Sequence, residues 1–269
     1  MKVCRRSPDG WLPATAPRGR RHGQSLPDKM DVMIKINRPI PVERIRLLIF
    51  DLDGTLIDSR QDLCNSVNAM LRQYGRTELP CDLIATYIGD GAPMLVRRAL
   101  GDPDDQKLVE EASFSFLAHY REHKLDFTYV YAGINESLQA IREARNGEVK
   151  MAVLSNKPVN PSRAIVEALG LGEFFFQVYG GNSFPTKKPD PQGARQLVKE
   201  AGAAPEQAVM IGDSDNDVLT AVNAGMYSVG LKYGLSPATL EKVTPDVLLD
   251  RPDELGELFT AVGEPKWTE

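Results

Sequence analysis

The sequence Ile-Arg-Leu-Leu-Ile-Phe-Asp-Leu-Asp-Gly-Thr runs from residue 45 to residue 55. Its first six residues form a short apolar run, which is typical of a strand buried on both faces. Asp51 and Asp53 follow at once. Side chains two positions apart in an extended chain point to the same side, so both acids are predicted to face one pocket. The carboxyl end of a parallel strand is where such sheets bind ligands. A simple Asp-Gly turn after an edge strand is the alternative interpretation.

Four further short apolar runs follow this stretch, and helical patterns lie between them. Two of these patterns are each followed by a glycine, which commonly ends a helix. Strands that alternate with helices are typical of the α/β class, in which a doubly wound parallel sheet carries helices on both faces. The predicted strands are 150–154, 176–179, 208–211 and 227–230, and the two helical patterns are 160–169 and 192–201.

The interval between Ser59 and Tyr131 breaks this alternation, because it holds helical periods and no convincing strand. A normal crossover between parallel strands needs only about 10 to 15 residues. We therefore predict an all-helical cap domain inserted into the α/β core. The predicted domains are an extension at 1–45, a catalytic core at 46–64 and 132–262, a helical cap at 65–131 and a tail at 263–269.

Charge divides the chain into two unequal parts. Residues 1–46 contain 11 Lys and Arg against 4 Asp and Glu, whereas the remaining residues contain 21 against 33, and the two parts sum to the net charge of -5. The basic, Pro- and Gly-rich extension has too little apolar surface to fold, so we expect most of it to be disordered. The acidic remainder argues against a nucleic-acid partner, and no apolar run is long enough for a membrane span.

The cysteines are few and scattered. The sequence contains three, at Cys4, Cys64 and Cys81. This number and spacing match neither a disulfide framework nor a zinc site. We expect reduced thiols in a cytoplasmic protein.

Two polar motifs follow later strands of the predicted sheet. Ser155-Asn156 ends one apolar run, and its hydroxyl and amide could bind phosphoryl oxygens, although a serine before a helix is also a routine N-cap. Lys187-Lys188-Pro189-Asp190-Pro191 precedes a helix and offers a compact positive charge, although a solvated surface lysine is the ordinary interpretation of this motif alone.

An acidic motif follows another strand. Gly212-Asp213-Ser214-Asp215-Asn216-Asp217 opens a helix and places Asp213 and Asp217 four residues apart. Acids in a first helical turn often serve only as caps. Carboxylates this close repel one another unless a cation joins them, and hard oxygen ligands favour Mg²⁺.

Together these four motifs resemble those of the haloacid dehalogenase superfamily, in the same order, with the helical insertion where its cap belongs. Ile88-Gly89-Asp90-Gly91-Ala92-Pro93 and Lys188-Pro189-Asp190-Pro191 are most similar to the phosphoglycolate phosphatases of that superfamily. One departure is Tyr131-Ala132-Gly133, where that family usually has Pro before the Gly, and it bears on hinge stiffness rather than on chemistry.

The resemblance implies a Mg²⁺-dependent phosphomonoester hydrolase that converts 2-phosphoglycolate to glycolate and phosphate. Asp51 would be the nucleophile that forms an aspartyl-phosphate, and Asp53 the general acid and base. Mg²⁺ would bind Asp51, the backbone carbonyl of Asp53 and Asp213, with Asp217 supporting either the metal or Lys188. The implied phosphoryl- and substrate-binding residues are Ser155, Lys188, Gly54, Thr55 and Asn156. The expected partner is a small phosphorylated metabolite, and the expected state is a monomer or a homodimer.

The cap is expected to select the substrate. Gly89-Asp90-Gly91 precedes a predicted helix, so its backbone N–H groups could hold the carboxylate of phosphoglycolate. A glycine loop that serves only as a turn is the alternative. Arg97 and Arg98 could contribute, but adjacent residues of a helix cannot both face one pocket.

Other functions remain open at this stage. A nucleotidase, sugar phosphatase, pyrophosphatase or phosphate-shifting mutase could share the same motifs. A phosphonate-cleaving enzyme would need a cap lysine, and the cap contains only Lys107 and Lys124, neither in a suggestive motif. A signalling receiver domain is disfavoured by the long insertion and by Asp53. A catalytically dead binding module is disfavoured because every motif position is filled.

Overall fold

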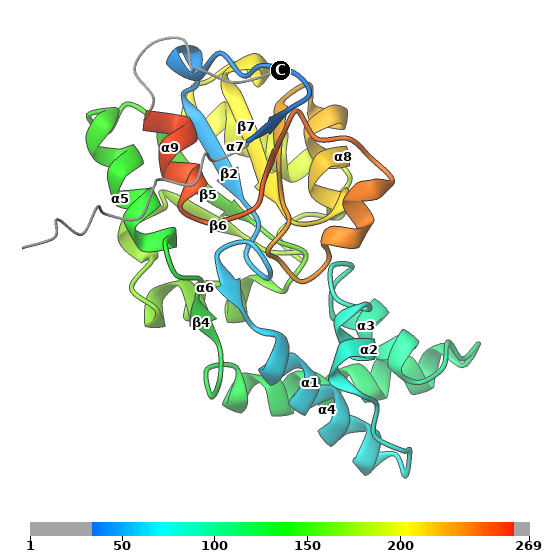
Figure 1. The fold of residues 1–269 in the computed structure, drawn as a ribbon. Coiled ribbons are helices and arrows are strands. Elements are labelled where there is room, and N and C mark those ends of the chain that lie inside the picture. Colours follow the sequence, from blue (N-terminus) through cyan, green and yellow to red (C-terminus); the bar gives the residue numbers. More distant parts are fainter. Residues whose placement is uncertain (1–33, 261–269) are drawn as a thin grey trace, which may run out of the picture. The chain divides into compact units, whose positions relative to one another are not determined.

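The computed structural model of the chain describes residues 34–260, and it is built around one seven-stranded sheet (Figure 1). The strand order is β1-β9-β8-β7-β2-β5-β6, and every neighbouring pair is parallel except β1 and β9. This confirms the predicted α/β fold. The strands are β1 Lys35–Ile36, β2 Leu47–Phe50, β5 Lys150–Leu154, β6 Gln177–Tyr179, β7 Ala208–Gly212, β8 Tyr227–Leu231 and β9 Val247–Leu249.

Helices cover both faces of the sheet, and the central strand β2 is therefore buried throughout. Leu47 and Ile49 pack in a cluster with residues of α7 and α8. The alternate residues Leu48 and Phe50 point to the other face and are also completely buried. Figure 1 shows α5 and α9 on the opposite side of the sheet from α8. The core helices are α5 Ile134–Ala144, α6 Val159–Ala168, α7 Gln192–Ala201, α8 Asp215–Ala224 and α9 Glu254–Thr260.

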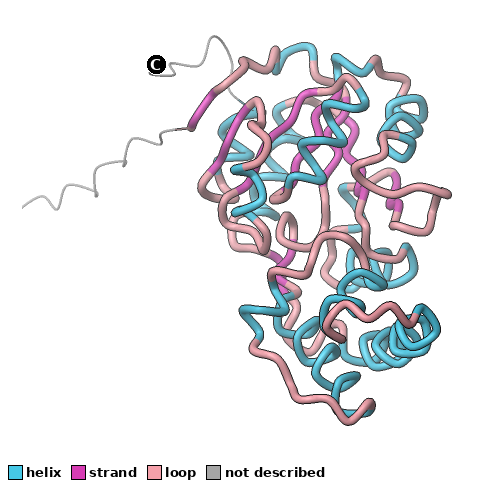
Figure 2. Tube along the Cα trace, turned by 90° about the vertical axis from the view of Figure 1, so that its right-hand side faces the viewer, coloured by secondary structure: helices cyan, strands magenta, loops and turns pink. Residues whose placement is uncertain are grey.

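A helical cap is inserted between β2 and β5, below the sheet in the view of Figure 2. It contains α1 Arg60–Gln73, α2 Cys81–Ala85, α3 Ala92–Ala99 and α4 Gln106–His123, with α1 and α3 packed against α4. A two-stranded antiparallel ribbon, β3 Ile57–Asp58 and β4 Tyr129–Val130, joins it to the core. The predicted boundary after residue 64 was therefore wrong, since it falls inside α1. The two-residue strands escaped prediction because they are too short to show alternation.

Residues 34–45, the last part of the extension that is predicted to be mostly disordered, belong to the fold of the core. β1 pairs with β9, a single turn of 3-10 helix spans Val42–Arg44, and Ile34 and Ile45 are buried. These apolar side chains supply the contacts that composition alone did not reveal. The rest of the predicted extension, residues 1–33, and the tail at 263–269 lie outside the described residues.

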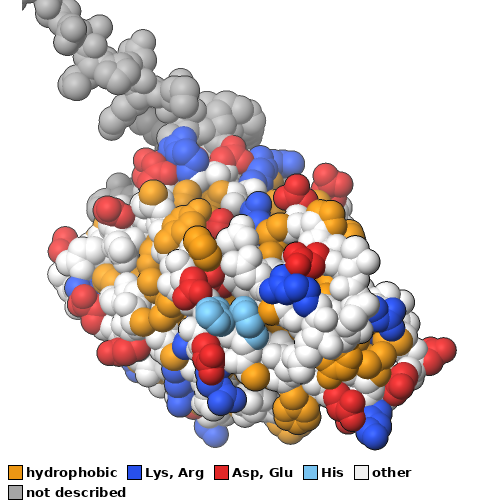
Figure 3. Space-filling model, turned by 90° about the horizontal axis from the view of Figure 1, so that it is seen from below, with side chains coloured by type: hydrophobic (Ala, Val, Ile, Leu, Met, Phe, Trp, Pro, Cys, Tyr) orange, Lys and Arg blue, Asp and Glu red, His pale blue; other side chains and the backbone are white. Residues whose placement is uncertain are grey.

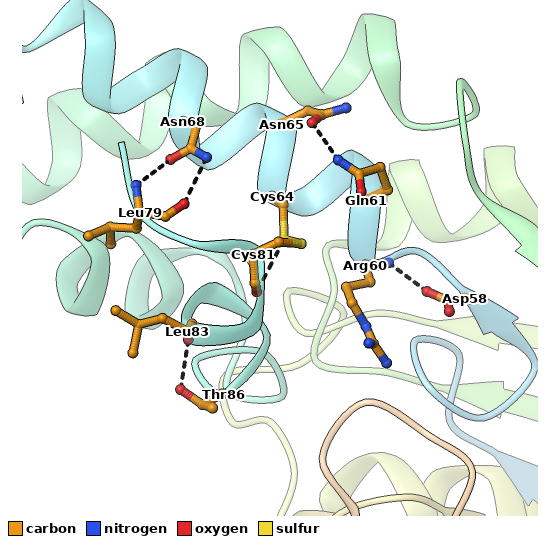
Figure 4. The surroundings of a disulfide bond; sticks show 10 residues. All are labelled: Asp58, Arg60, Gln61, Cys64, Asn65, Asn68, Leu79, Cys81, Leu83 and Thr86. Atoms are coloured by element: carbon orange, nitrogen blue, oxygen red, sulfur yellow. Dashed lines mark hydrogen bonds between the residues drawn. A yellow bond between two sulfur atoms is a disulfide. The ribbon is translucent and has the colours of Figure 1, made fainter. Parts of the chain in front are cut away.

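Cys64 and Cys81 form a disulfide bond, so the expectation of reduced thiols was wrong for this pair (Figure 4). The cysteines are 17 residues apart, but their Cα atoms lie 5.4 Å from each other. Asn68 holds the chain that returns from α1 to α2, because its side chain bonds both the N–H and the C=O of Leu79, at 2.9 and 3.0 Å. The pairing depends on this helical hairpin, which spacing alone does not reveal.

The surface of the cap mixes acidic, basic and apolar side chains (Figure 3). His119 and His123 lie one helical turn apart on α4, and their rings stack with centroids 4.3 Å apart. None of the helices within residues 34–260 is long and apolar enough to cross a membrane.

Candidate active site

Three neighbouring strands bring the predicted site residues together. β2 lies between β5 and β7, with Phe50 in register with Val153 and Ile211. Asp51 follows β2, Ser155 follows β5 and Asp213 follows β7. All three side chains therefore emerge at the same edge of the sheet.

A cavity lies where this edge meets the cap. It offers about 50 Å³ to the centres of water-sized molecules, which is room for a compact ligand. The core contributes its polar lining, Asp51, Asp53, Ser155, Asn156, Lys157, Asp213, Ser214 and Ser236. The cap and the loop after β5 contribute a mostly apolar lining, Leu63, Ile88, Gly89, Gly91, Ala92, Leu95, Phe116, Leu117, Tyr120 and Pro158.

Three buried carboxylates gather beside the cavity. One oxygen each of Asp51, Asp213 and Asp217 lies within 4.8 Å of the others. Lys188 Nζ lies 2.9 Å from Asp51 Oδ1 and 2.6 Å from Asp217 Oδ1. Burial raises the pKa of Asp51 to about 6 although Lys188 opposes this, and burial with the charges of Asp217 and Asp51 raises the pKa of Asp213 to about 8. The cluster carries more negative charge than one lysine balances.

Asp213 is fixed from behind by the loop that follows β8. Its Oδ2 accepts hydrogen bonds from the backbone N–H groups of Leu235 at 2.7 Å and Ser236 at 2.8 Å. Gly54 and Gly234 crowd the same carboxylate, since a Cβ on either glycine would lie within 2.4 Å of Asp213 Oδ2. Gly54 also has a φ of +83°, so this turn requires glycine for two reasons.

Asp53 is held by two buried side chains. Ser59 Oγ donates to Asp53 Oδ1 at 2.5 Å, and Lys157 Nζ lies 2.8 Å from each carboxylate oxygen. Burial opposes the charge of Lys157, but the adjacent Asp53 carboxylate outweighs this and raises the pKa of Lys157. Asp51 and Asp53 both line the cavity, as their spacing predicted.

The loop Ile88–Gly91 of the cap is bonded to the core through its carbonyl oxygens. Asn156 Nδ2 donates to Gly89 O at 2.9 Å, Ser236 Oγ to Ile88 O at 3.3 Å, and Lys187 Nζ to Asp90 O. Asn216 Nδ2 also donates to the Asp90 carboxylate at 2.8 Å. These bonds hold the cap against three core loops.

Four predicted site residues do not line the cavity. Gly54 and Thr55 lie in the turn after Asp53, and the Thr55 side chain is completely buried. Lys188 and Asp217 contact each other within the acidic cluster, of which Asp217 is a member. The structure thus places Lys188 where it balances carboxylate charge.

A sequence profile of the family described as haloacid dehalogenase-like hydrolase matches residues 48–231. The chain belongs to this family. The phosphoglycolate phosphatase of Photobacterium profundum is 37% identical over 220 residues, which cover 79% of this chain and 95% of that protein. The phosphoglycolate phosphatase of Pseudomonas putida is 38% identical over 228 residues, which cover 82% of this chain and 80% of that protein.

Solved structures agree with this assignment. The crystal structure of a predicted phosphoglycolate phosphatase from Haemophilus somnus matches with a TM-score of 0.74 and 30% identity, over 80% of this chain and 98% of that one. The chain is therefore an enzyme of the haloacid dehalogenase-like family and is most similar to its phosphoglycolate phosphatases.

Two residues of this haloacid dehalogenase-like hydrolase were missed by sequence reasoning. Lys157 directly follows Ser155-Asn156, so its place at a strand end was a usable signal. Tyr120 of α4 lies over Lys157, with Nζ 4.6 Å from the ring centroid. Nothing in the sequence around Tyr120 distinguishes it from an ordinary core residue of an amphipathic helix.

The acidic cluster fits a divalent cation. Asp51, Asp213 and Asp217 carry three negative charges when ionised, and Lys188 supplies one positive charge. Carboxylate oxygens are the ligands that Mg²⁺ prefers. The raised pKa values of Asp51 and Asp213 show that the buried site favours an added positive charge, either a proton or a metal ion.

Proposed function

We propose that this enzyme hydrolyses 2-phosphoglycolate to glycolate and phosphate, with Mg²⁺, through an aspartyl-phosphate on Asp51. The observation that carries the proposal is the pairing of Asp51 and Asp53 in one small cavity between the core and the cap, beside the carboxylates of Asp213 and Asp217. The named relatives support the choice of substrate.

The chain's own residues divide the reaction into two steps. In the first, a carboxylate oxygen of Asp51 attacks phosphorus, the ester P–O bond breaks, and Asp53 donates a proton to the leaving alkoxide. In the second, Asp53 takes a proton from a water molecule whose oxygen attacks the same phosphorus, and phosphate leaves as Asp51 is regenerated. The bonds from Ser59 and Lys157 fix the position of the Asp53 carboxylate.

Several residues support these steps. Ser155 lines the cavity and binds the phosphoryl group through its hydroxyl, while both N–H donors of Asn156 Nδ2 are taken by Gly89 O and Lys188 O. Lys188 keeps Asp51 ionised and lowers its repulsion of the substrate. Asp51, Asp213 and the backbone carbonyl of Asp53 would hold Mg²⁺, which would supply positive charge to offset the negative charge of the transition state. The cap excludes water from the aspartyl-phosphate until the alcohol has left.

The size and lining of the cavity favour a small metabolite. The space for the centres of water-sized molecules is about 50 Å³, and the cap loop with Gly89 and Gly91 lines the site. A small phosphorylated metabolite as the substrate supports a cytoplasmic location, whereas the disulfide between Cys64 and Cys81 does not.

A substrate panel tests the proposal. Phosphate release with Mg²⁺ would be measured for 2-phosphoglycolate, sugar phosphates, nucleoside monophosphates and pyrophosphate, and ranked by kcat/KM. We expect 2-phosphoglycolate to lead by about 100-fold, a difference of about 2.7 kcal/mol. A different leading substrate would replace the proposed substrate and keep the phosphatase chemistry.

A further inference from the structure

Two buried polar residues that line the cavity, Lys157 and Tyr120, do not contact the substrate in the two proposed reaction steps. In those steps Lys157 only holds Asp53, and Tyr120 has no role. Both side chains line the cavity, Lys157 from the core and Tyr120 from the cap. Their neighbours on the cap side are apolar, so these two residues supply the polar groups of that part of the lining.

Lys157 is the one cation among the described residues that line the cavity. Its ammonium has three N–H donors, and the two oxygens of Asp53 account for two contacts at 2.8 Å. Other nearby cations are already engaged outside the cavity. Arg98 pairs with the Asp90 carboxylate at 2.5 Å, and Lys188 with Asp51 and Asp217.

Tyr120 is only 2% exposed, and within residues 34–260 its hydroxyl oxygen has no hydrogen-bond partner in good geometry, although Lys157 lies close enough to interact with it. Buried hydroxyls are almost always bonded, so an unbonded hydroxyl in a cavity lining needs an explanation, and a role in the reaction is one. Burial raises the pKa of Tyr120 to about 12, so the hydroxyl keeps its proton and can donate it in a hydrogen bond. The ring also lies over Lys157, with Nζ 4.6 Å from its centroid.

The reaction sets a distance requirement that this pair meets. In 2-phosphoglycolate one methylene group separates the ester oxygen from the carboxylate carbon. The group that protonates the ester oxygen and the group that binds the carboxylate must therefore be close neighbours. Asp53 and Lys157 are in direct contact, and Tyr120 packs on Lys157.

We propose that Lys157 Nζ and Tyr120 Oη form the subsite that binds a carboxylate carried by the leaving alcohol. This inference rests on the proposed function, because it assigns residues to the carboxylate of 2-phosphoglycolate. The ligand class is a phosphate ester with a carboxylate attached directly to the carbon that bears the ester oxygen. A buried ammonium and a buried hydroxyl bind such an anion far better than a neutral group of the same size.

The experiment compares two substrates that differ only at the proposed subsite. 2-Hydroxyethyl phosphate replaces the carboxylate of 2-phosphoglycolate by a hydroxymethyl group and keeps an alkoxide leaving group. The measured quantity is the ratio of kcat/KM for the two substrates, in the Mg²⁺-loaded full-length enzyme. This ratio cancels effects on phosphoryl transfer and on proton donation by Asp53, which both substrates need.

The variants are Lys157→Met, which removes the charge, and Tyr120→Phe, which removes only the hydroxyl. We expect the ratio to fall about 100-fold in the first and about 10-fold in the second, the usual size of charged and neutral hydrogen-bond losses. Matched controls are Lys107→Met, at an exposed position of α4, and Tyr74→Phe, at the end of α1. Both controls should keep the ratio of the wild type.

The possible outcomes separate failure of the subsite from failure of the proposed function. Equal losses for both substrates in the variants would overturn the subsite and leave the proposed function intact. A wild-type enzyme without preference for 2-phosphoglycolate over 2-hydroxyethyl phosphate would overturn the proposed function and the subsite together. If Lys157→Met does not fold, Tyr120→Phe decides alone, because it keeps the buried ring, and an unchanged ratio in it overturns the inference.

Discussion

Lys188 and Asp217 form an ion pair with 2.6 Å between Nζ and Oδ1, and both side chains are almost completely buried. The second oxygen of Asp217 accepts hydrogen bonds from the backbone N–H and the hydroxyl of Ser214, at 3.1 and 2.6 Å. Protein donors thus engage both oxygens of Asp217. This arrangement supports a role for Asp217 in holding Lys188 more than a role as a direct metal ligand, a choice that the sequence left open.

Two amide variants separate these roles. Asp213→Asn should weaken Mg²⁺ binding by about 100-fold, because it removes a ligand charge from the acidic cluster. Asp217→Asn should weaken Mg²⁺ binding less, but should lower kcat, because Lys188 loses the partner that holds it beside Asp51. Calorimetric titration of each purified variant with MgCl₂ measures the affinities. Equal loss of affinity in both variants would make Asp217 a metal ligand.

Replacing the nucleophile should abolish turnover without unfolding the enzyme. Asp51→Asn removes the attacking carboxylate, and we expect kcat to fall by at least about 1000-fold. Circular dichroism and thermal melts should show a folded protein, because an amide occupies the same volume. A folded and active variant would refute the role of Asp51.

Replacing the proposed general acid, Asp53, should affect kcat and KM differently. Asp53→Asn should lower kcat for 2-phosphoglycolate by about 100- to 10,000-fold while changing KM little. The loss should be smaller for p-nitrophenyl phosphate, because its phenolate leaves without a proton donor. A raised KM with unchanged kcat would mean that Asp53 contributes uniform binding and not proton transfer.

Much of the core could be predicted because a parallel sheet is buried on both faces. Such strands are continuous apolar runs, so β5 at Lys150–Leu154 has the predicted bounds. The helix α7, Gln192–Ala201, also matches, since Gly202 ends it in the left-handed conformation. The polar residues at the strand ends then converge by topology, and Asp51, Ser155 and Asp213 do line the cavity or its rim as one group.

The rest depends on contacts between distant segments. The position of Lys157 in the site depends on its contacts with Asp53, 104 residues away, and with Tyr120 in the cap. The disulfide between Cys64 and Cys81 depends on how α1 returns toward α2. No local pattern specifies either contact, since each is fixed by the packing of the cap.

A substitution in the cap loop at Gly91 tests whether this loop contributes to substrate selection. A Cβ at Gly91 would lie 2.9 Å from the carbonyl oxygen of Asn156, and its φ of +82° strains any other residue. Gly91→Leu should therefore lower kcat/KM for 2-phosphoglycolate by about 10-fold or more, and should affect p-nitrophenyl phosphate less. Gly101→Leu is the matched control, because Gly101 has a similar φ of +85° with no atom within 4 Å of its Cβ position. Equal losses for both substrates in Gly91→Leu would refute a role of the loop in substrate selection.

The acidic cluster predicts how the stability of the metal-free enzyme depends on pH. The pKa of Asp213 is raised to about 8 and that of Asp51 to about 6, whereas both lie near 4 in an unfolded chain. Between pH 4 and pH 8 the folded state therefore binds more protons at these groups than the unfolded state does. The free energy of unfolding then falls as pH rises through this window, and the contribution is fully present only below about pH 4.

Urea unfolding of chelator-treated enzyme at several pH values between 5 and 8 measures this slope. The wild type should lose more stability over the range than Asp213→Asn, because the amide cannot titrate and ionisable groups outside the acidic cluster cancel in the comparison. Added Mg²⁺ should restore the wild type most strongly near pH 8, where the metal replaces the fewest protons. Near pH 7 the binding of Mg²⁺ should release protons. Calorimetry detects this release, because the measured binding enthalpy then depends on the ionisation enthalpy of the buffer. Identical slopes for wild type and variant would show that Asp213 does not hold a proton in the folded, metal-free enzyme.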